Sequence, residues 1–226
     1  IIVPVYRTER YLPGCLQSLA DQTHKDFEIV VVDDGSPGNC QSIVSEFRSC
    51  SSIKYVRHPK NRGQLISRFT GVDNSSASYV GFLDSDDKAL PHFVETLVNA
   101  AEASNADIIG SLAPGGKAGE RFEIKGASAI LNAYSTDDIP SWSTWTKLYK
   151  RDLLRSLFSL RSIANQKYIS HDDLAINVFC ALQSPSYLHL PLVLVDYNVD
   201  RTDSFTNSLD SESFRRKFSG IIATHD

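Results

Sequence analysis

Two groups of carboxylates in this sequence each follow directly after a run of apolar residues. They are Asp33 and Asp34 after residues 27–32, and Asp84, Ser85, Asp86 and Asp87 after residues 79–83. Hard divalent cations such as Mg²⁺ and Mn²⁺ bind carboxylate oxygens, and phosphate oxygens and water complete their coordination. Such a cation stabilises the negative charge that builds on a leaving phosphate group. The two groups therefore predict cation-assisted chemistry on a phosphate-bearing ligand.

Each acidic group also has a simpler interpretation, because Asp and Ser favour turns and helix N-caps. One group alone would leave the two interpretations about equal. Both groups, however, follow predicted strands of one sheet. Ligands of open parallel sheets bind beyond the carboxyl ends of the strands, so the pair of groups favours a ligand site.

The elements that must position these carboxylates alternate between strand and helix. Strands are predicted at residues 1–5, 27–32, 53–57, 79–83 and 108–109, and helices at residues 11–21, 43–47, 64–72 and 91–103. This alternation is typical of an α/β fold whose mostly parallel sheet is covered by helices on both faces. After Gly110 the pattern changes: residues 113–119 read as a loop, and the remaining half mixes short helices and strands.

Composition excludes several classes of function. The chain has 226 residues, with 23 basic and 27 acidic side chains and a formal charge of −4, which argues against broad nucleic-acid binding. Its four cysteines include no CxxC pair, so zinc or thioredoxin-type chemistry is not expected. We expect the cysteines to be reduced thiols of a cytosolic protein. No apolar run is long enough for a transmembrane helix. Because the sequence contains no Met and opens inside an apolar run, we expect it to be part of a longer chain or to lack some residues of that chain.

An ordered set of motifs resembles glycosyltransferase family 2, an inverting family with the fold called GT-A. The motifs are Ile-Val-Pro-Val-Tyr at residues 2–6, Cys-Leu-x-Ser-Leu at 15–19, Phe-Glu-Ile-Val-Val-Val-Asp-Asp-Gly-Ser at 27–36, Asn-x-Gly at 61–63, and Tyr-Val-Gly-Phe-Leu-Asp-Ser-Asp-Asp at 79–87. Trp-Thr-Lys-Leu-Tyr at 145–149 resembles a later motif of bacterial members that build surface polysaccharides. A single Asp-x-Asp carries little weight, whereas this ordered set is specific.

The resemblance implies an enzyme that moves a sugar from a nucleotide diphosphate to an acceptor hydroxyl with the help of Mn²⁺ or Mg²⁺. UDP-sugars are the commonest donors of the family, and a glycan or lipid-linked glycan in polysaccharide biosynthesis is the expected acceptor. Residues 1–110 would bind the nucleotide sugar and residues 111–226 the acceptor, as two halves of one catalytic domain. The enzyme would work in the cytoplasm or at the inner face of the cell membrane.

Donor contacts are carried over to the matching positions. Asp34 would contact the nucleotide base, with Asp33 beside it. Asp86 would be the main metal ligand, with Asp84 as the second and also facing the ribose and donor sugar. The other residues expected near the donor are Pro4, Val5 and Tyr6 around the base, Ser85 between the two acids, and Arg68 and Arg201. A surface salt bridge is an equal alternative for Arg201.

Inverting transfer needs a carboxylate that accepts the proton of the attacking hydroxyl. Family members carry it in a Glu-Asp pair at the start of a helix, and Asp173 matches the second, catalytic position. Asp172 replaces the usual Glu and keeps its charge. Capping of the helix by these acids is the alternative, and it is compatible with catalysis. Candidate acceptor contacts are Asp172, His171 and Trp145. The alternatives are that His171 is solvated or hydrogen-bonded and that Trp145 packs in the core.

Residues 209–222 predict a basic amphipathic helix that would either rest on an anionic membrane surface or pack against protein. Two other functions compete with the glycosyltransferase. A sugar nucleotidyltransferase would need a glycine-rich phosphate loop, and residues 4–10 contain no glycine. A non-catalytic nucleotide-binding or glycan-binding module of a larger synthase would not need Asp84, Asp86 and Asp173 together.

Overall fold

The computed structural model describes residues 1–47, 52–116, 119–157 and 172–199. The predicted helix at residues 209–222 and the candidate site residues His171 and Arg201 lie outside this part of the chain. Among the described residues, no helix is both long and apolar enough to cross a membrane.

The N-terminal part contains a three-stranded parallel sheet. Its order is β1 (Ile2–Val5), β2 (Glu28–Asp33) and β3 (Ser52–Arg57). Residues 29–32 of β2 are fully buried, as expected for a parallel strand covered on both faces. On the other side of β1, Ile2 forms a parallel bridge with Phe82, which joins this sheet to the strands that follow.

A second sheet has five strands and is mixed. Its order is β4 (Tyr79–Gly81), β8 (Lys147–Lys150), β6 (Ile108–Leu112), β9 (Ser186–Val193) and β7 (Phe122–Lys125). β8 runs antiparallel to both β4 and β6, whereas β6 and β9 are parallel. A short antiparallel pair, β5 (Lys88–Ala89) and β10 (Val195–Asp196), lies beside the larger sheets.

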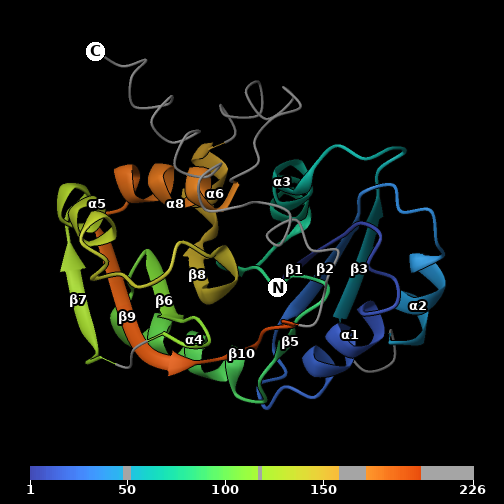
Figure 1. Ribbon diagram of the computed structural model, residues 1–226, viewed down its shortest axis with the longest axis horizontal. Helices are drawn as coiled ribbons and strands as arrows, with labels where there is room; N and C mark the ends of the chain where they lie inside the picture. The colour runs from blue at the N-terminus through green and yellow to red at the C-terminus, as the bar shows by residue number, and fades with distance from the viewer. Residues whose placement is uncertain (48–51, 117–118, 158–171, 200–226) are drawn as a thin grey trace.

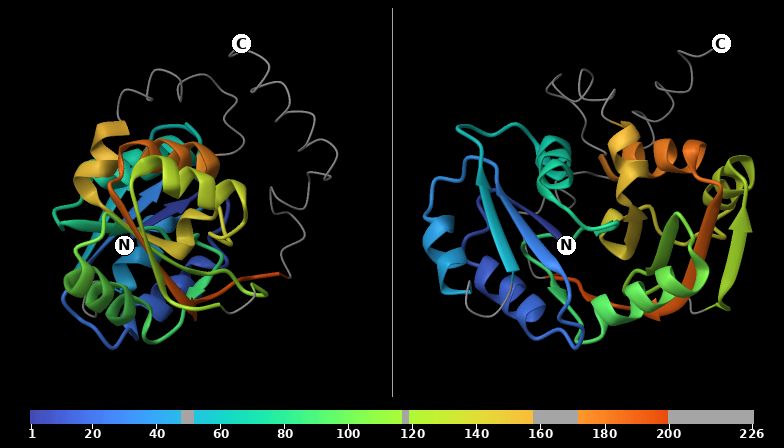
Figure 2. Two further views of the ribbon diagram at one scale, coloured as in Figure 1. Left: turned by 90° about the vertical axis from the view of Figure 1, so that its left-hand side faces the viewer. Right: turned by 180° about the vertical axis from the view of Figure 1, so that it is seen from behind.

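Helices cover both faces of the sheets (Figure 1). One layer contains α1 (Leu12–Ala20), α2 (Cys40–Glu46) and α4 (Phe93–Ser104), and the other contains α3 (Gln64–Asn74), α5 (Ala127–Ser135), α6 (Arg151–Ser156) and α8 (Asp172–Gln183). Both layers also separate when the molecule is seen from behind (Figure 2). Each helix layer packs on one face of the sheets and forms a separate apolar core with it. Successive side chains of a strand point to opposite faces, so Val31 packs in the core under α1 and α4 and Val30 in the core under α3 and α8.

The predicted α/β layering is confirmed, and each helix predicted within the first 110 residues is present to within a few residues of its expected bounds. The structure adds one feature to the expected parallel sheet. β8, which comes late in the sequence, inserts between β4 and β6. This insertion brings residues 141–146, which precede β8 and include the 3-10 turn η1 (Thr144–Thr146), close to the end of β4.

Candidate active site

Asp33 lies at the carboxyl end of β2 and is fully buried. Its Oδ1 accepts a hydrogen bond from the backbone N–H of Ser36 at 2.8 Å, and its Oδ2 accepts one from the Tyr55 hydroxyl at 2.6 Å. Arg57 Nη1 lies 3.0 Å from the same Oδ2. Asp33 therefore fixes the turn after β2, and its contact with a nucleotide stays a prediction.

Asp34 binds the loop that leads into α3. Its Oδ1 lies 2.6 Å from His58 Nδ1 and accepts from the Arg62 N–H at 2.9 Å, while Oδ2 accepts from the Gly63 N–H at 2.8 Å. Gly63 has a φ of +94°, a conformation that glycine adopts without steric cost. Behind it, His58 Nε2 lies 3.0 Å from the Thr70 hydroxyl. This carboxylate is thus held rigidly at the end of β2, where the predicted base contact would occur.

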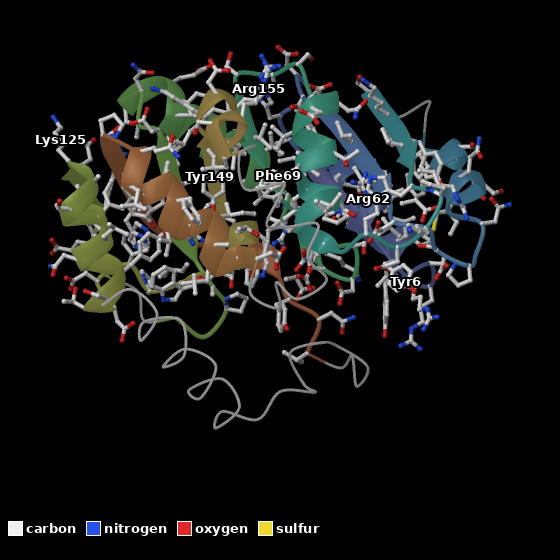
Figure 3. All side chains as sticks on the ribbon, turned by 90° about the horizontal axis from the view of Figure 1, so that it is seen from above. Tyr6, Arg62, Phe69, Lys125, Tyr149 and Arg155 are labelled. Atoms are coloured by element: carbon white, nitrogen blue, oxygen red, sulfur yellow. The ribbon has the colours of Figure 1, made fainter. Side chains whose placement is uncertain are left out.

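The residues predicted to surround the base come from β1 and the turn after it. Pro4 and Val5 are buried in β1, and the Val5 carbonyl accepts from the Asp34 N–H at 2.8 Å. Tyr6 is 36% exposed, and the Arg7 guanidinium lies 5.3 Å from the centre of its ring. Seen from above, Tyr6 lies in the part of the molecule built from β1, β2 and β3 (Figure 3). The structure therefore brings Val5 into direct contact with Asp34, with Pro4 and Tyr6 on either side of Val5 in the chain.

The second acidic group follows β4. Asp84 Oδ1 accepts from Gln64 Nε2 at 3.0 Å and from Arg68 Nη2 at 3.2 Å. Burial raises the pKa of the Asp84 carboxyl to about 6, against the opposing charge of Arg68. Ser85 is buried, and its hydroxyl lies 2.7 Å from that of Thr8 in the loop after β1. The acidic turn is thereby tied to α3 through Asp84 and to the loop after β1 through Ser85.

Asp86 faces a cavity of about 470 Å³. The lining residues are Arg10, Tyr11, Gly14, Asp86, Lys88, Asp196, Tyr197, Asn198 and Val199. The neighbouring Asp87 is buried and accepts from the Asn198 N–H at 2.9 Å, and burial raises its pKa to about 8. Asp87 therefore holds the chain just after β10 in place, whereas Asp86 lines the cavity.

The carboxylate oxygens of Asp84 and Asp86 are suitable ligands for a divalent cation. Asp84 and Asp86 flank a single residue and supply hard oxygen ligands. In the part of the chain that the structure describes, no group of three or more His, Cys, Asp or Glu side chains is arranged to hold a metal. A cation here would take its other ligands from phosphate oxygens and water, which is how Mg²⁺ binds at phosphate-transfer sites.

Arg68, on α3, connects the end of β4 with the start of α8. Only 1% of its surface is exposed. Its Nη1 donates to Asp172 Oδ2 and to Asp173 Oδ1, both at 2.5 Å, while Nη2 reaches Asp84. Burial alone would lower the pKa of Arg68, but the three carboxylates outweigh it and raise that pKa above its usual value. The structure thus brings four predicted site residues into one ion cluster.

Burial raises the pKa of the Asp172 carboxyl, against the opposing charge of Arg68. Asp173 is more accessible, since 34% of its side chain is exposed. Its Oδ1 also accepts from the Thr144 hydroxyl at 2.7 Å. Both acids lie in the first turn of α8, where the helix dipole favours negative charge. Asp173 is therefore oriented by two donors and still open to solvent.

A buried asparagine holds this end of α8. Asn177 donates from Nδ2 to the carbonyls of Trp142 at 2.5 Å and Asp173 at 2.7 Å. Its Oδ1 accepts from the hydroxyls of Tyr134 and Tyr149, each at 2.9 Å. All the polar groups of this amide are satisfied, so the helix start and the segment before β8 are fixed together.

Trp145, a predicted acceptor contact, is 7% exposed and belongs to the core. Its ring stacks on that of Tyr197, with centroids 5.6 Å apart and an interplanar angle of 12°. Its contact with an acceptor stays a prediction. Sequence reasoning gave no role to Gln64, His58 or Thr144, because uncharged polar residues and a lone His carry no spacing signal.

Comparison with known proteins agrees with this arrangement. The sequence model described as Glycosyl transferase family 2 matches residues 1–168. The chain is 35% identical over 188 residues to the glycosyltransferase GlyA of Streptococcus pneumoniae, covering 75% of this chain and 27% of GlyA. It is 30% identical over 166 residues to the uncharacterized glycosyltransferase EpsJ of Bacillus subtilis, covering 68% of this chain and 48% of EpsJ. The chain therefore spans about half or less of the length of these relatives.

Solved structures show the same fold. S. aureus TarS, residues 1–349, in complex with UDP-GlcNAc superposes with a TM-score of 0.76 at 23% identity, over 95% of this chain and 62% of that one. A mannosyltransferase from Pyrobaculum calidifontis, in complex with GDP-Man and Mn²⁺, gives a TM-score of 0.64 at 17% identity, over 89% of this chain and 57% of that one. The fold is GT-A, and with the family match over most of its length the chain belongs to glycosyltransferase family 2.

Proposed function

We propose that this chain is the catalytic part of an inverting glycosyltransferase that moves a sugar from a nucleotide diphosphate, with a UDP-sugar as the favoured donor, to an acceptor hydroxyl on a glycan or lipid-linked glycan. One observation carries the proposal: Arg68 binds Asp84 on one side and Asp173 on the other. A carboxylate suited to the leaving group and one suited to the acceptor thus belong to a single cluster. The UDP-GlcNAc complex of the TarS fold relative supports the donor class.

In this mechanism Asp173 accepts the proton of the acceptor hydroxyl as its oxygen attacks C1 of the donor sugar. The bond between C1 and the diphosphate oxygen breaks, and the nucleotide diphosphate leaves with the bonding electrons. Arg68 and the Thr144 hydroxyl both donate to Oδ1 of Asp173 and orient it. When bound at Asp86 and Asp84, a divalent cation supplies positive charge to the leaving diphosphate.

The donor half of the proposal is tested by binding. We expect one nucleotide diphosphate of a panel to raise the melting temperature only when Mn²⁺ or Mg²⁺ is present. A ligand at 100 times its dissociation constant stabilises the folded state by ~2.7 kcal/mol. The Asp86→Ala variant should lose this shift, whereas Asp152→Asn, an exposed acid on α6, should keep it. A shift that needs no metal would contradict the cation site.

The catalytic half is tested by transfer. Asp173→Asn keeps the size of the side chain but removes the base, so turnover should fall by ~10²–10⁴ with nucleotide affinity nearly unchanged. Asp152→Asn serves as the matched control for the Asp-to-Asn change. Nucleotide binding without transfer by the wild type would favour a non-catalytic module, and an active Asp173→Asn variant would exclude Asp173 as the base.

A further inference from the structure

Lys147 is the first residue of β8 and is fully buried. Its ammonium contacts three oxygens: the carbonyl of Ser141 at 2.6 Å, the carbonyl of Ser143 at 2.8 Å and the hydroxyl of Thr146 at 3.2 Å. All three belong to residues 141–146, here called the 141–146 segment. An ammonium has three N–H donors, so this one short segment satisfies the whole group.

The position of Lys147 in the sheet makes these contacts unusual. On β8 it is paired with Gly110 of β6, which is paired in turn with His189 of β9. Tyr149, two residues along β8 on the same face, belongs to the apolar core under α5 and α8. Burying an amine in such a core costs several kcal/mol unless it is paired or hydrogen-bonded. Among the described residues, the hydrogen bonds of the Lys147 ammonium all go to the 141–146 segment, and the centre of the Tyr134 ring lies 5.7 Å from it. Burial lowers the pKa of Lys147 to about 7, with the charge of Asp173 opposing the decrease.

The 141–146 segment touches both sides of the candidate active site. Its Thr144 hydroxyl donates to Asp173 at 2.7 Å. Its Trp145 ring stacks on Tyr197, which lines the cavity that Asp86 borders. A shift of this segment would therefore move the hydroxyl that orients Asp173 and the aromatic wall beside Asp86 at the same time.

We infer that Lys147 is a positioning residue of the transfer reaction: it fixes the 141–146 segment so that the Thr144 hydroxyl holds Asp173 in the orientation needed to accept the proton of the acceptor. This inference rests on the proposed function. Lys147 touches neither the donor nor the acceptor in this scheme and acts only through the segment.

The first experiment needs no substrate, because both tryptophans of the chain, Trp142 and Trp145, belong to the 141–146 segment. Lys147→Met keeps a chain of similar length without the donors, and apolar replacement of a buried charge is often compatible with folding. We expect red-shifted tryptophan emission and stronger acrylamide quenching in folded Lys147→Met. The control Lys150→Met, on the same strand but at a partly exposed ion pair with Asp107, should match the wild type. Unchanged emission and quenching in Lys147→Met would overturn the inference.

The second experiment compares Thr144→Val, which has the same shape but no hydroxyl, with Thr144→Ser, which keeps the hydroxyl. A hydrogen bond to a charged group corresponds to about 10-fold to 150-fold in rate. We expect kcat to fall by that factor in Thr144→Val and in Lys147→Met. The nucleotide Kd should be unchanged in Thr144→Val, and most activity should be retained in Thr144→Ser.

The two proposals fail in different ways. If the wild type transfers sugar, Asp173→Asn is inactive and Thr144→Val is as active as Thr144→Ser, the positioning role is wrong and the proposed function stands. If folded Lys147→Met keeps the kcat of the wild type while Thr144→Val loses activity, Lys147 does not act through the Thr144 hydroxyl, and the inference is also wrong. If the wild type transfers no sugar to any acceptor, the proposed function fails, and the fluorescence comparison still decides whether Lys147 fixes the segment.

Discussion

Replacing Arg68 with Met removes a cation that three carboxylates share. Arg68 is 1% exposed, and its two terminal nitrogens reach Asp84, Asp172 and Asp173 at 2.5–3.2 Å. The methionine side chain fills part of the same space without charge. Two carboxylates of α8 and one from the end of β4 would then face one another, with Asp172 buried and Asp84 and Asp173 partly exposed.

The expected cost follows from this geometry. Removing one partner of a buried ion pair destabilises a protein by about 3–5 kcal/mol, because a buried charge is left uncompensated. Here more than one charge is left, but Asp84 and Asp173 keep solvent contact, so we expect a cost near the lower end of that range. Asp172→Asn in the Arg68→Met background removes one of the facing charges and should recover part of the loss. Arg68→Lys keeps the charge but lacks the two-nitrogen fork, so it should fall between the wild type and Arg68→Met.

Urea unfolding at pH 7, followed by circular dichroism, measures these differences directly. With an unchanged m value, the midpoint shift converts to a free energy of unfolding. The wild type, Arg68→Met, Arg68→Lys and the double variant form one series. The reasoning is refuted if Arg68→Met lies within about 1 kcal/mol of the wild type, or if Asp172→Asn destabilises the Arg68→Met protein further.

Three other predictions concern the surroundings of the site. Asn177→Leu leaves two tyrosine hydroxyls and one carbonyl without these partners. The free energy of unfolding, measured in urea, should therefore fall by at least ~3 kcal/mol. A decrease below about 1 kcal/mol would contradict the role of this hydrogen-bond network. Gly110→Ala would place a Cβ against the Tyr187 hydroxyl, so its melting temperature should fall by the equivalent of about 1–3 kcal/mol, while Gly119→Ala, in open space, should not change it. The pKa of Lys147 in the fold, about 7, lies below its usual 10.5. Between these pH values the unfolded chain holds more protons, so the stability of the wild type relative to Lys147→Met should rise with pH; a constant or falling difference would show that the ammonium keeps its usual pKa.

Much of the fold and part of the site could be predicted because they depend on local patterns. The apolar run of β2 and the helical spacing of α4 are read from a few consecutive residues. Asp34 and Asp84 follow strands of one parallel arrangement, so their meeting at one edge follows from topology alone. Asp173 is a candidate base from the sequence because it lies at the start of a helix that resembles the family pattern, and its role stays a prediction.

The contacts that give these acids their environment could not be predicted. Arg68 lies 104 residues from Asp172, and Thr144 lies 29 residues from Asp173. No periodicity connects such positions. Lys147 is part of the Trp-Thr-Lys-Leu-Tyr motif at residues 145–149, and its sequence neighbours do not indicate that its ammonium is buried.

The sequence by itself therefore determined the layers of the fold and the chemical types at the ends of its strands, since a period of two or of 3.6 residues is a local property. The tertiary structure alone decided that β8 inserts antiparallel between β4 and β6. That insertion carries Thr144 and Lys147 to Asp173. Strand order and register depend on how distant apolar faces pack together, and this packing is settled only when the whole chain folds.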